Sequence, residues 1–156
     1  MILISACLAG LKVRYNGTDS LDKRIQQLVL ENKAVTVCPE LMGGFTTPRE
    51  PAEIVGGDGK DVLDGKDVLD GKAIVVERSG RDVTGLYLKG AYETLHKALE
   101  LGATKVILKE YSPSCGSAMI YNGNFNHTKA SGVGVTTALL RRNNIEVISE
   151  EDFFTE

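Results

Sequence analysis

Short apolar runs alternate along this chain with longer segments in which hydrophobic residues recur at a helical spacing. The apolar runs predict β-strands at residues 2–5, 34–37, 73–77, 105–109 and 145–148. The first run carries its apolar residues without alternation, which is typical of a strand that is buried on both faces. The pattern therefore indicates a sheet whose two faces are both covered.

The segments between the runs predict amphipathic helices. The first helix begins at a cap provided by Asp19 or Ser20 and places one apolar stripe inward, made of Leu21, Ile25, Leu28 and Val29. The longest helix runs from a cap at Asp82 or Thr84 to about Leu101 and is predicted to place Leu88, Ala91, Tyr92, Leu95 and Leu99 inward. A glycine follows its last residue, as expected for the C-terminal end of a helix.

The order of these elements, with a further short helix at residues 134–142, predicts a three-layer α/β/α, Rossmann-like open sheet that is mostly parallel. A length of 156 residues suits one domain spanning residues 1–156. Residues 41–72 are rich in Gly, Pro and Asp and predict an irregular loop. Within that stretch the six residues from Lys60 to Gly65 are repeated at once at residues 66–71, which indicates a local duplication, because a solenoid needs more copies.

Composition and charge exclude some classes of partner. The formal net charge of −3 argues against binding of extended nucleic acid, which needs clustered Lys and Arg. A single nucleobase or nucleoside is not excluded by charge. No apolar run approaches the roughly 20 residues that cross a bilayer, so no membrane partner is expected. The first residues lack the basic region of a secretory signal, and we therefore expect a cytoplasmic location. The oligomeric state cannot be read from the sequence.

The three cysteines each follow one of the predicted strands. Cys7 comes after the first strand, Cys38 after the second, and Cys115 lies in the turn beyond the strand at 105–109. The carboxyl ends of parallel strands meet at one edge of a sheet, where ligands bind. We therefore expect the three thiols to converge. Three soft ligands suit an iron–sulfur cluster or zinc and leave one coordination position for a substrate.

Two of the cysteines have neighbours that are able to take part in chemistry. In Cys38-Pro39-Glu40 the proline restricts the backbone between a soft ligand and a carboxylate that is able to act as a general base. The alternative is a core cysteine beside a solvated glutamate. The turn from Ser112 to Gly116 offers hydroxyl and backbone N–H donors that stabilise negative charge, its alternative being a local hydroxyl turn with a buried cysteine.

Arg14 and Tyr15 follow Cys7 closely and are candidates for substrate binding. Arg14 would bind a carbonyl or another polar edge, and Tyr15 would stack on a ring; the alternatives are a surface ion pair and core packing. His96 lies within the long predicted helix and is expected to be structural. His127 has no metal-type spacing to a cysteine, and we do not place it in the site.

Six motifs occur in one order along nearly the whole chain: Ile4-Ser-Ala-Cys-Leu, Arg14-Tyr-Asn-Gly, Cys38-Pro-Glu, Pro48-Arg-Glu-Pro-Ala-Glu-Ile, Leu108-Lys-Glu-Tyr-Ser-Pro-Ser-Cys-Gly and Gly134-Val-Thr-Thr-Ala-Leu-Leu. In these motifs the chain resembles the bacterial thiouracil desulfurase family. The resemblance implies a [4Fe–4S] cluster held by Cys7, Cys38 and Cys115, whose fourth iron takes sulfur from a thiolated nucleobase. It also implies that Glu40 and one serine assist catalysis, with Ser112 favoured over Ser114.

The implied reaction is a non-redox C–S cleavage of a thiolated nucleobase such as thiouracil. The open iron polarises the thiocarbonyl as a Lewis acid, Glu40 activates water, and Ser112 donates to the developing charge. Two other interpretations remain. The thiols would bind zinc in a hydrolytic or structural site, or the protein would be a non-enzymatic sulfur carrier or ligand-binding module.

Overall fold

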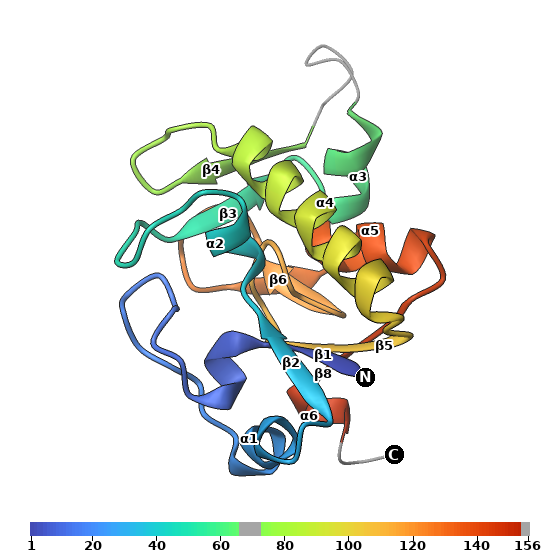
Figure 1. Ribbon diagram of the computed structural model, residues 1–156. Helices are drawn as coiled ribbons and strands as arrows, with labels where there is room; N and C mark the ends of the chain where they lie inside the picture. Colours follow the sequence, from blue (N-terminus) through green and yellow to red (C-terminus); the bar gives the residue numbers. More distant parts are fainter. Residues whose placement is uncertain (66–72, 154–156) are drawn as a thin grey trace.

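The central sheet has four parallel strands (Figure 1). A computed structural model describes residues 1–65 and 73–153. In it the strands stand in the order β2-β1-β5-β8, and Ile4 of β1 pairs with Thr36 of β2 and with Ile107 of β5. Their bounds are β1 (Ile2–Ser5), β2 (Ala34–Val37), β5 (Lys105–Leu108) and β8 (Glu146–Ser149). These strands confirm the prediction for four of the five apolar runs, and the fifth run forms the strand β4 (Ile74–Glu77), which pairs antiparallel with β3 (Ala52–Val55) outside this sheet.

Helices cover both faces of this sheet, so the predicted three-layer α/β/α arrangement is confirmed. Alternate residues of the strands face opposite ways: Leu3 and Val106 pack in one core cluster, and Ile4 and Ile107 pack in another. The first cluster includes residues of α4 (Thr84–Leu101) and α5 (Val135–Arg142), and the second includes residues of α1 (Lys23–Leu30) and α6 (Glu150–Phe153). Burial of both side-chain sets explains why β1 reads as a continuous apolar run.

Two antiparallel hairpins lie beyond the sheet, and one of them corrects the sequence prediction. They pair β3 (Ala52–Val55) with β4 (Ile74–Glu77) and β6 (Met119–Tyr121) with β7 (Lys129–Ser131). The irregular loop predicted for residues 41–72 was therefore wrong where it contains β3 and α3 (Gly59–Asp64). The helix α3 depends on a capping box between Asp58 and Asp61, a local signal that the surrounding glycines obscured. The second copy of the repeat lies outside the described residues.

The first helix begins later than predicted. The Asp22 carboxylate accepts a hydrogen bond from the Arg24 N–H and caps α1, whereas Asp19 accepts one from the Leu21 N–H in the preceding turn. Leu21, expected inside, is 43% exposed, because it precedes the helix. Three of the four possible cap positions here carry an oxygen acceptor, so the sequence alone does not discriminate between them.

The buried stripe of α4 also differs from the prediction. Tyr92 and Leu99, expected inside, are 57% and 58% exposed, and small residues such as Gly90 and Ala98 face inward instead. The reason is close approach of the short helix α2 (Pro39–Met42): a Cβ on Gly90 would lie 2.0 Å from the Pro39 carbonyl oxygen. This approach fixes the backbone that carries Cys38. Among the described residues, no helix has the length and hydropathy that crossing a membrane requires.

Candidate active site

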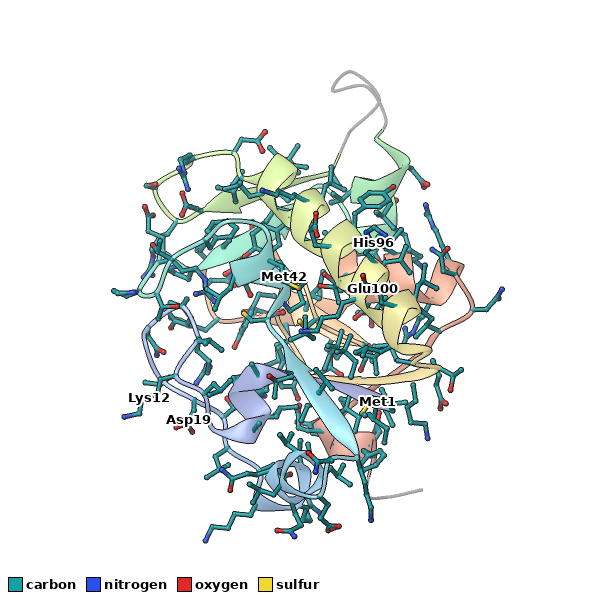
Figure 2. The ribbon with its side chains drawn as sticks, viewed as in Figure 1. Met1, Lys12, Asp19, Met42, His96 and Glu100 are labelled. Atoms are coloured by element: carbon teal, nitrogen blue, oxygen red, sulfur yellow. The ribbon has the colours of Figure 1, made fainter. Side chains whose placement is uncertain are left out.

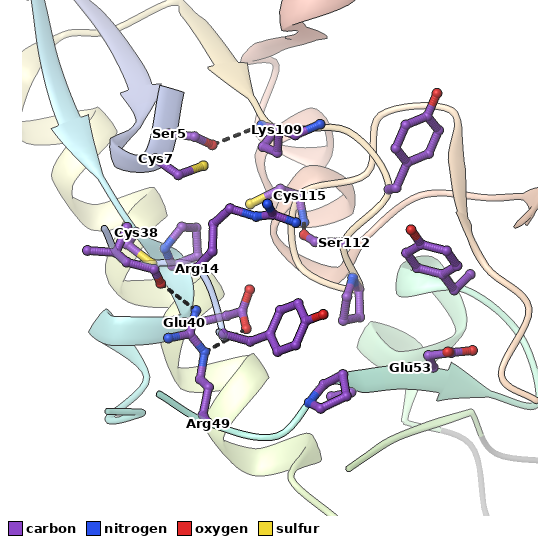
Figure 3. Close-up of a pocket in the computed structure, with 18 of the residues that line it drawn as sticks. Ser5, Cys7, Arg14, Cys38, Glu40, Arg49, Glu53, Lys109, Ser112 and Cys115 are labelled. Atoms are coloured by element: carbon purple, nitrogen blue, oxygen red, sulfur yellow. Dashed lines mark hydrogen bonds and ion pairs between the residues drawn. The ribbon is translucent and has the colours of Figure 1, made fainter. Parts of the chain in front are cut away.

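A cavity of about 290 Å³ lies at the carboxyl edge of the central sheet (Figure 3). One wall comes from the segments that follow β1, β2 and β5, and the opposite wall comes from the two hairpins. The position agrees with the general rule for open α/β sheets. All three cysteines line this cavity, as do Glu40 and Ser112.

Each thiol reaches the cavity from a different strand end. Cys7 lies in the 3₁₀ helix η1 (Ala6–Ala9) directly after β1, Cys38 is the N-cap of α2 after β2, and Cys115 lies in the turn after β5. Figure 3 shows their sulfur atoms pointing toward a common space. Cys7 and Cys115 are buried, and Cys38 is half-buried. The three cysteines converge on one cavity as predicted, and all three are free thiols.

Burial raises the pKa of all three thiols, and neighbouring cysteines add to the effect for Cys7 and Cys115. Burial raises the pKa of the Cys7 thiol to about 12, and the neighbouring Cys38 adds to the effect. Burial likewise raises the pKa of Cys115, with further contributions from Glu40, Cys38 and Cys7. The pKa of Cys38 is raised by burial, with a smaller contribution from Glu40. With their pKa raised in this way, the thiols favour the neutral form at neutral pH, and a bound cation would stabilise them as thiolates.

The donor set is compatible with an iron–sulfur cluster. Cysteine thiolates hold the irons of such clusters, and different irons bind different cysteines, so three thiols on one cavity meet this requirement. Within residues 1–65 and 73–153, no three His, Cys, Asp or Glu side chains are placed to hold one metal ion together.

The Glu40 carboxylate is held by two donors at the cavity wall. Its Oε1 accepts hydrogen bonds from Arg49 Nε at 3.2 Å and from the Tyr87 hydroxyl at 2.9 Å. Burial raises the pKa of Tyr87, and the adjacent Glu40 raises it further, so Tyr87 stays a protonated donor. Glu40 is therefore an ordered, partly buried carboxylate, and the alternative of a solvated glutamate does not apply.

The two serines of the cysteine turn have different surroundings. Ser112 lines the cavity, and its Oγ accepts a hydrogen bond from the Cys115 N–H at 2.7 Å. Ser114 is 1% exposed and lies outside the cavity lining, with its hydroxyl 2.8 Å from Thr136 Oγ1 on α5. The structure thus keeps Ser112 as the candidate and gives Ser114 a packing role, because the Ser114 hydroxyl is directed at Thr136 and not at the cavity.

A buried glutamate that we did not single out from the sequence closes the same turn. Glu110 is 6% exposed, and its Oε1 accepts hydrogen bonds from the backbone N–H groups of Tyr111 at 3.2 Å and Ser117 at 2.6 Å. Its Oε2 accepts a hydrogen bond from the Ser117 hydroxyl. Glu110 therefore joins the two ends of the loop that contains Cys115. The sequence signal from which Glu110 could have been found was its position just before the Ser-Pro-Ser-Cys turn.

Arg14 and Tyr15 both line the cavity, as their place near Cys7 suggested. In Figure 3 the Arg14 side chain extends across the cavity toward Cys115 and Ser112. Tyr15 is 39% exposed at the rim. The surroundings thus permit the predicted substrate contacts, which stay a prediction.

The two histidines are placed differently. His96 is exposed on α4, away from the cavity (Figure 2). His127 lines the cavity, although its spacing gave no reason to include it. It enters through the β6–β7 hairpin, with Tyr121 and Phe125, and Glu53 of β3 binds the backbone of that hairpin. Sequence reasoning missed these residues because hairpin packing brings them to the site.

Fold and cavity together define an α/β protein with a three-thiol small-molecule site at the carboxyl edge of a parallel sheet. The sequence model of the 2-thiouracil desulfurase family matches residues 2–152. The chain therefore belongs to the 2-thiouracil desulfurase family, and the expected family is confirmed.

Two relatives extend this comparison. An uncharacterized protein of Bacillus subtilis (strain 168), YbbK, is 55% identical over 152 residues, which cover 97% of each chain. A solved structure described as the [4Fe–4S]-dependent thiouracil desulfidase TudS is 40% identical and has a TM-score of 0.82. That match covers 99% of this chain and 93% of the other, so the likeness includes the elements that carry the three cysteines.

Proposed function

We propose that this protein removes sulfur from a thiolated nucleobase such as thiouracil, using a [4Fe–4S] cluster bound by Cys7, Cys38 and Cys115. The observation that carries the proposal is the placement of three free thiols from three strand ends on one cavity beside an ordered carboxylate. Family membership and the TudS neighbour support the same chemistry. When bound, the cluster supplies a Lewis-acidic iron with an open position for a soft sulfur ligand.

Glu40 is the proposed general base. Its Oε1 is occupied by Arg49 and Tyr87, so Oε2 is the oxygen that orients a water molecule and takes its proton. That water attacks the ring carbon that carries sulfur, and the C–S bond breaks with its electron pair leaving on sulfur. The sulfur departs as hydrosulfide with a proton that came from the water, and the product carries a carbonyl oxygen. No electron enters or leaves the substrate overall.

Ser112 and Arg14 are proposed to stabilise the substrate during this step. Ser112 Oγ accepts from a backbone N–H, which leaves its own proton free to donate to negative charge on the ring. Arg14 extends into the cavity and would donate to the ring carbonyl, while Tyr15 at the rim would pack on the ring. The cavity thereby places donors around the ring and a base near its reacting carbon.

The test is thiouracil turnover by protein reconstituted anaerobically with iron and sulfide. We expect the wild type to bind four irons per chain, to show cluster absorption, and to form uracil with release of sulfide. The variant Glu40→Gln should keep the iron and lose about 100-fold or more in kcat, the contribution typical of a positioned base. Glu93→Gln, at an exposed position on α4, is the matched control and should turn over like the wild type.

The other interpretations predict different outcomes. A colourless protein that retains one zinc per chain would overturn the cluster. A sulfur carrier would bind sulfide without forming uracil, and Glu40→Gln would leave its sulfur content unchanged. Wild-type turnover in Glu40→Gln would remove this carboxylate from the mechanism.

A further inference from the structure

The segment Pro48-Arg-Glu-Pro-Ala-Glu-Ile is not explained by the proposed reaction, yet its arginine lies at the cavity wall. The side chain of Arg49 is 6% exposed. It donates four hydrogen bonds, from Nε to Glu40 Oε1 at 3.2 Å, from Nη1 to Thr46 O at 3.2 Å and Thr47 Oγ1 at 3.1 Å, and from Nη2 to Val13 O at 2.8 Å. A guanidinium group with that many partners has one fixed orientation.

This orientation decides how Arg49 binds Glu40. Arginine commonly binds a carboxylate through two parallel hydrogen bonds, one to each oxygen. Here Nη1 and Nη2 are engaged by other acceptors, so only Nε reaches Glu40, and it reaches Oε1. The Tyr87 hydroxyl donates to the same oxygen. Among the described residues, no hydrogen bond reaches Oε2, so that oxygen is left for the cavity.

Arg49 also holds the backbone on both sides of Arg14. Its Nη2 donates to the Val13 carbonyl at 2.8 Å, and its backbone N–H donates to the Tyr15 carbonyl at 2.7 Å. The side chain of Arg14 itself has one long hydrogen bond, to Thr18 Oγ1 at 3.4 Å. The direction in which Arg14 enters the cavity is therefore set mainly by its backbone, which Arg49 fixes.

We propose that Arg49 is a positioning residue that fixes two groups at once: the Glu40 carboxylate, with Oε2 directed at the substrate, and the loop that presents Arg14. This inference rests on the proposed function, in which Glu40 acts on water and Arg14 binds the base. Tyr87 shares only the first role, because its hydroxyl donates to Glu40 and not to the 13–15 backbone. A comparison of Arg49 variants with Tyr87 variants therefore separates the effect on Glu40 from the effect on the Arg14 loop.

Kinetics of the reconstituted holoenzyme separate the two roles. Tyr87→Phe removes one hydroxyl and keeps the ring that packs edge-on against Phe45. We expect kcat to fall about tenfold with KM unchanged, because one hydrogen bond to a charged group is lost. Arg49→Lys should lower kcat to a similar degree and also raise KM, since a single ammonium cannot bind both Glu40 and Val13. Tyr92→Phe and Arg142→Lys, at exposed positions outside the cavity, are controls and should behave as the wild type.

A double-mutant cycle distinguishes positioning from a structural effect. In a Glu40→Gln background, the kcat penalties of Tyr87→Phe and Arg49→Lys should largely disappear, because the carboxylate on which they act is absent. The increase in KM from Arg49→Lys should remain, because it acts through Arg14. Full kcat penalties in the Glu40→Gln background would overturn the positioning of Glu40. An unchanged KM in Arg49→Lys would overturn the positioning of Arg14.

Two measurements on cluster-free protein do not depend on turnover. Limited trypsin digestion after Lys12 and Arg14 should be several times faster in Arg49→Lys than in Arg142→Lys; equal rates would overturn the loop contact. Chemical denaturation gives the free energy of unfolding of Arg49→Lys, Glu40→Gln and the double variant. The losses in this free energy should be non-additive, and strict additivity would overturn the contact with Glu40. If the wild type binds its cluster but leaves thiouracil intact, the proposed function fails, and these two measurements still decide the contacts of Arg49.

Discussion

The two walls of the cavity are built in different ways. Cys7 and Cys38 directly follow strands of the central sheet, so the hydrogen-bonded ladder of the sheet sets their spacing, and Cys115 lies beyond β5 in a turn that Glu110 closes. The opposite wall comes from two hairpins outside that sheet, and a side chain joins them: Glu53 Oε1 accepts hydrogen bonds from the backbone N–H of Gly123 at 2.9 Å and of Phe125 at 3.3 Å. The thiol wall thus extends directly from the central sheet, and the hairpin wall lies outside it and is held by a side chain that joins the two hairpins.

This difference matches a division of labour. A cluster needs ligands at invariant positions, and strand ends in one sheet provide them. A substrate needs a wall that can be shaped independently of those ligands, and loops on a rigid scaffold provide that. Phe125 and His127, which both line the cavity, adopt left-handed backbone conformations, with φ of 53° and 60°, so the loop between β6 and β7 turns tightly. We therefore expect changes in the two walls to separate cluster binding from substrate binding.

The largest effect should come from the thiol wall. Cys115→Ser replaces a buried thiol that we propose as a cluster ligand. We expect iron content to fall well below four per chain and thiouracil turnover to be lost, because a hydroxyl is a poor ligand for iron in a cluster. Circular dichroism should show the fold retained, since the substitution is nearly isosteric. Adding Ser117→Cys to Cys115→Ser should not restore iron binding, because Ser117 is bound to Glu110. Full iron content in Cys115→Ser would contradict the ligand assignment.

A second effect concerns the helix contact that places Cys38. A Cβ at Gly90 would lie 2.0 Å from the Pro39 carbonyl, so Gly90→Ala should lower the free energy of unfolding by about 2 kcal/mol and reduce iron binding. Gly85→Ala on the same helix is the matched control: nothing lies within 4 Å, and the alanine should stabilise by about 0.5 kcal/mol. Chemical denaturation measures both. Equal stability of the two variants would contradict the close approach of α2 and α4.

The smallest effect should come from the hairpin wall. Glu53→Ala removes the acceptor that holds the 123–125 backbone, and KM for thiouracil should rise about fivefold, the factor that one lost hydrogen bond of ordinary strength gives. Iron content should not change. Glu53→Gln keeps an oxygen acceptor and should stay closer to the wild type. A loss of iron in Glu53→Ala, with KM unchanged, would show that the two walls are not independent.

The elements of the central sheet were predictable because each is encoded locally. The run of apolar residues in β1 and the helical repeat of α4 follow from short-range patterns, and the structure places both within a residue or two of the prediction. The inward face of α4 was predicted in part: Ala91 is buried and Leu88 and Leu95 pack against the core, whereas Tyr92 and Leu99 are exposed. The sequence did not show that Gly90 faces inward, because that follows from the close approach of α2. The strand β3 was masked by the glycines and prolines around it.

The sequence by itself determined the strand ends at which the cysteines lie, and with them the edge where the site forms, since parallel strands share one carboxyl edge. Only the tertiary structure decided which side chains complete that site. Tyr87 meets Glu40 across 47 residues of chain, Arg49 meets Val13 across 36, and Ser112 rather than Ser114 faces the cavity. Such contacts depend on how distant segments pack, and no local pattern specifies that packing.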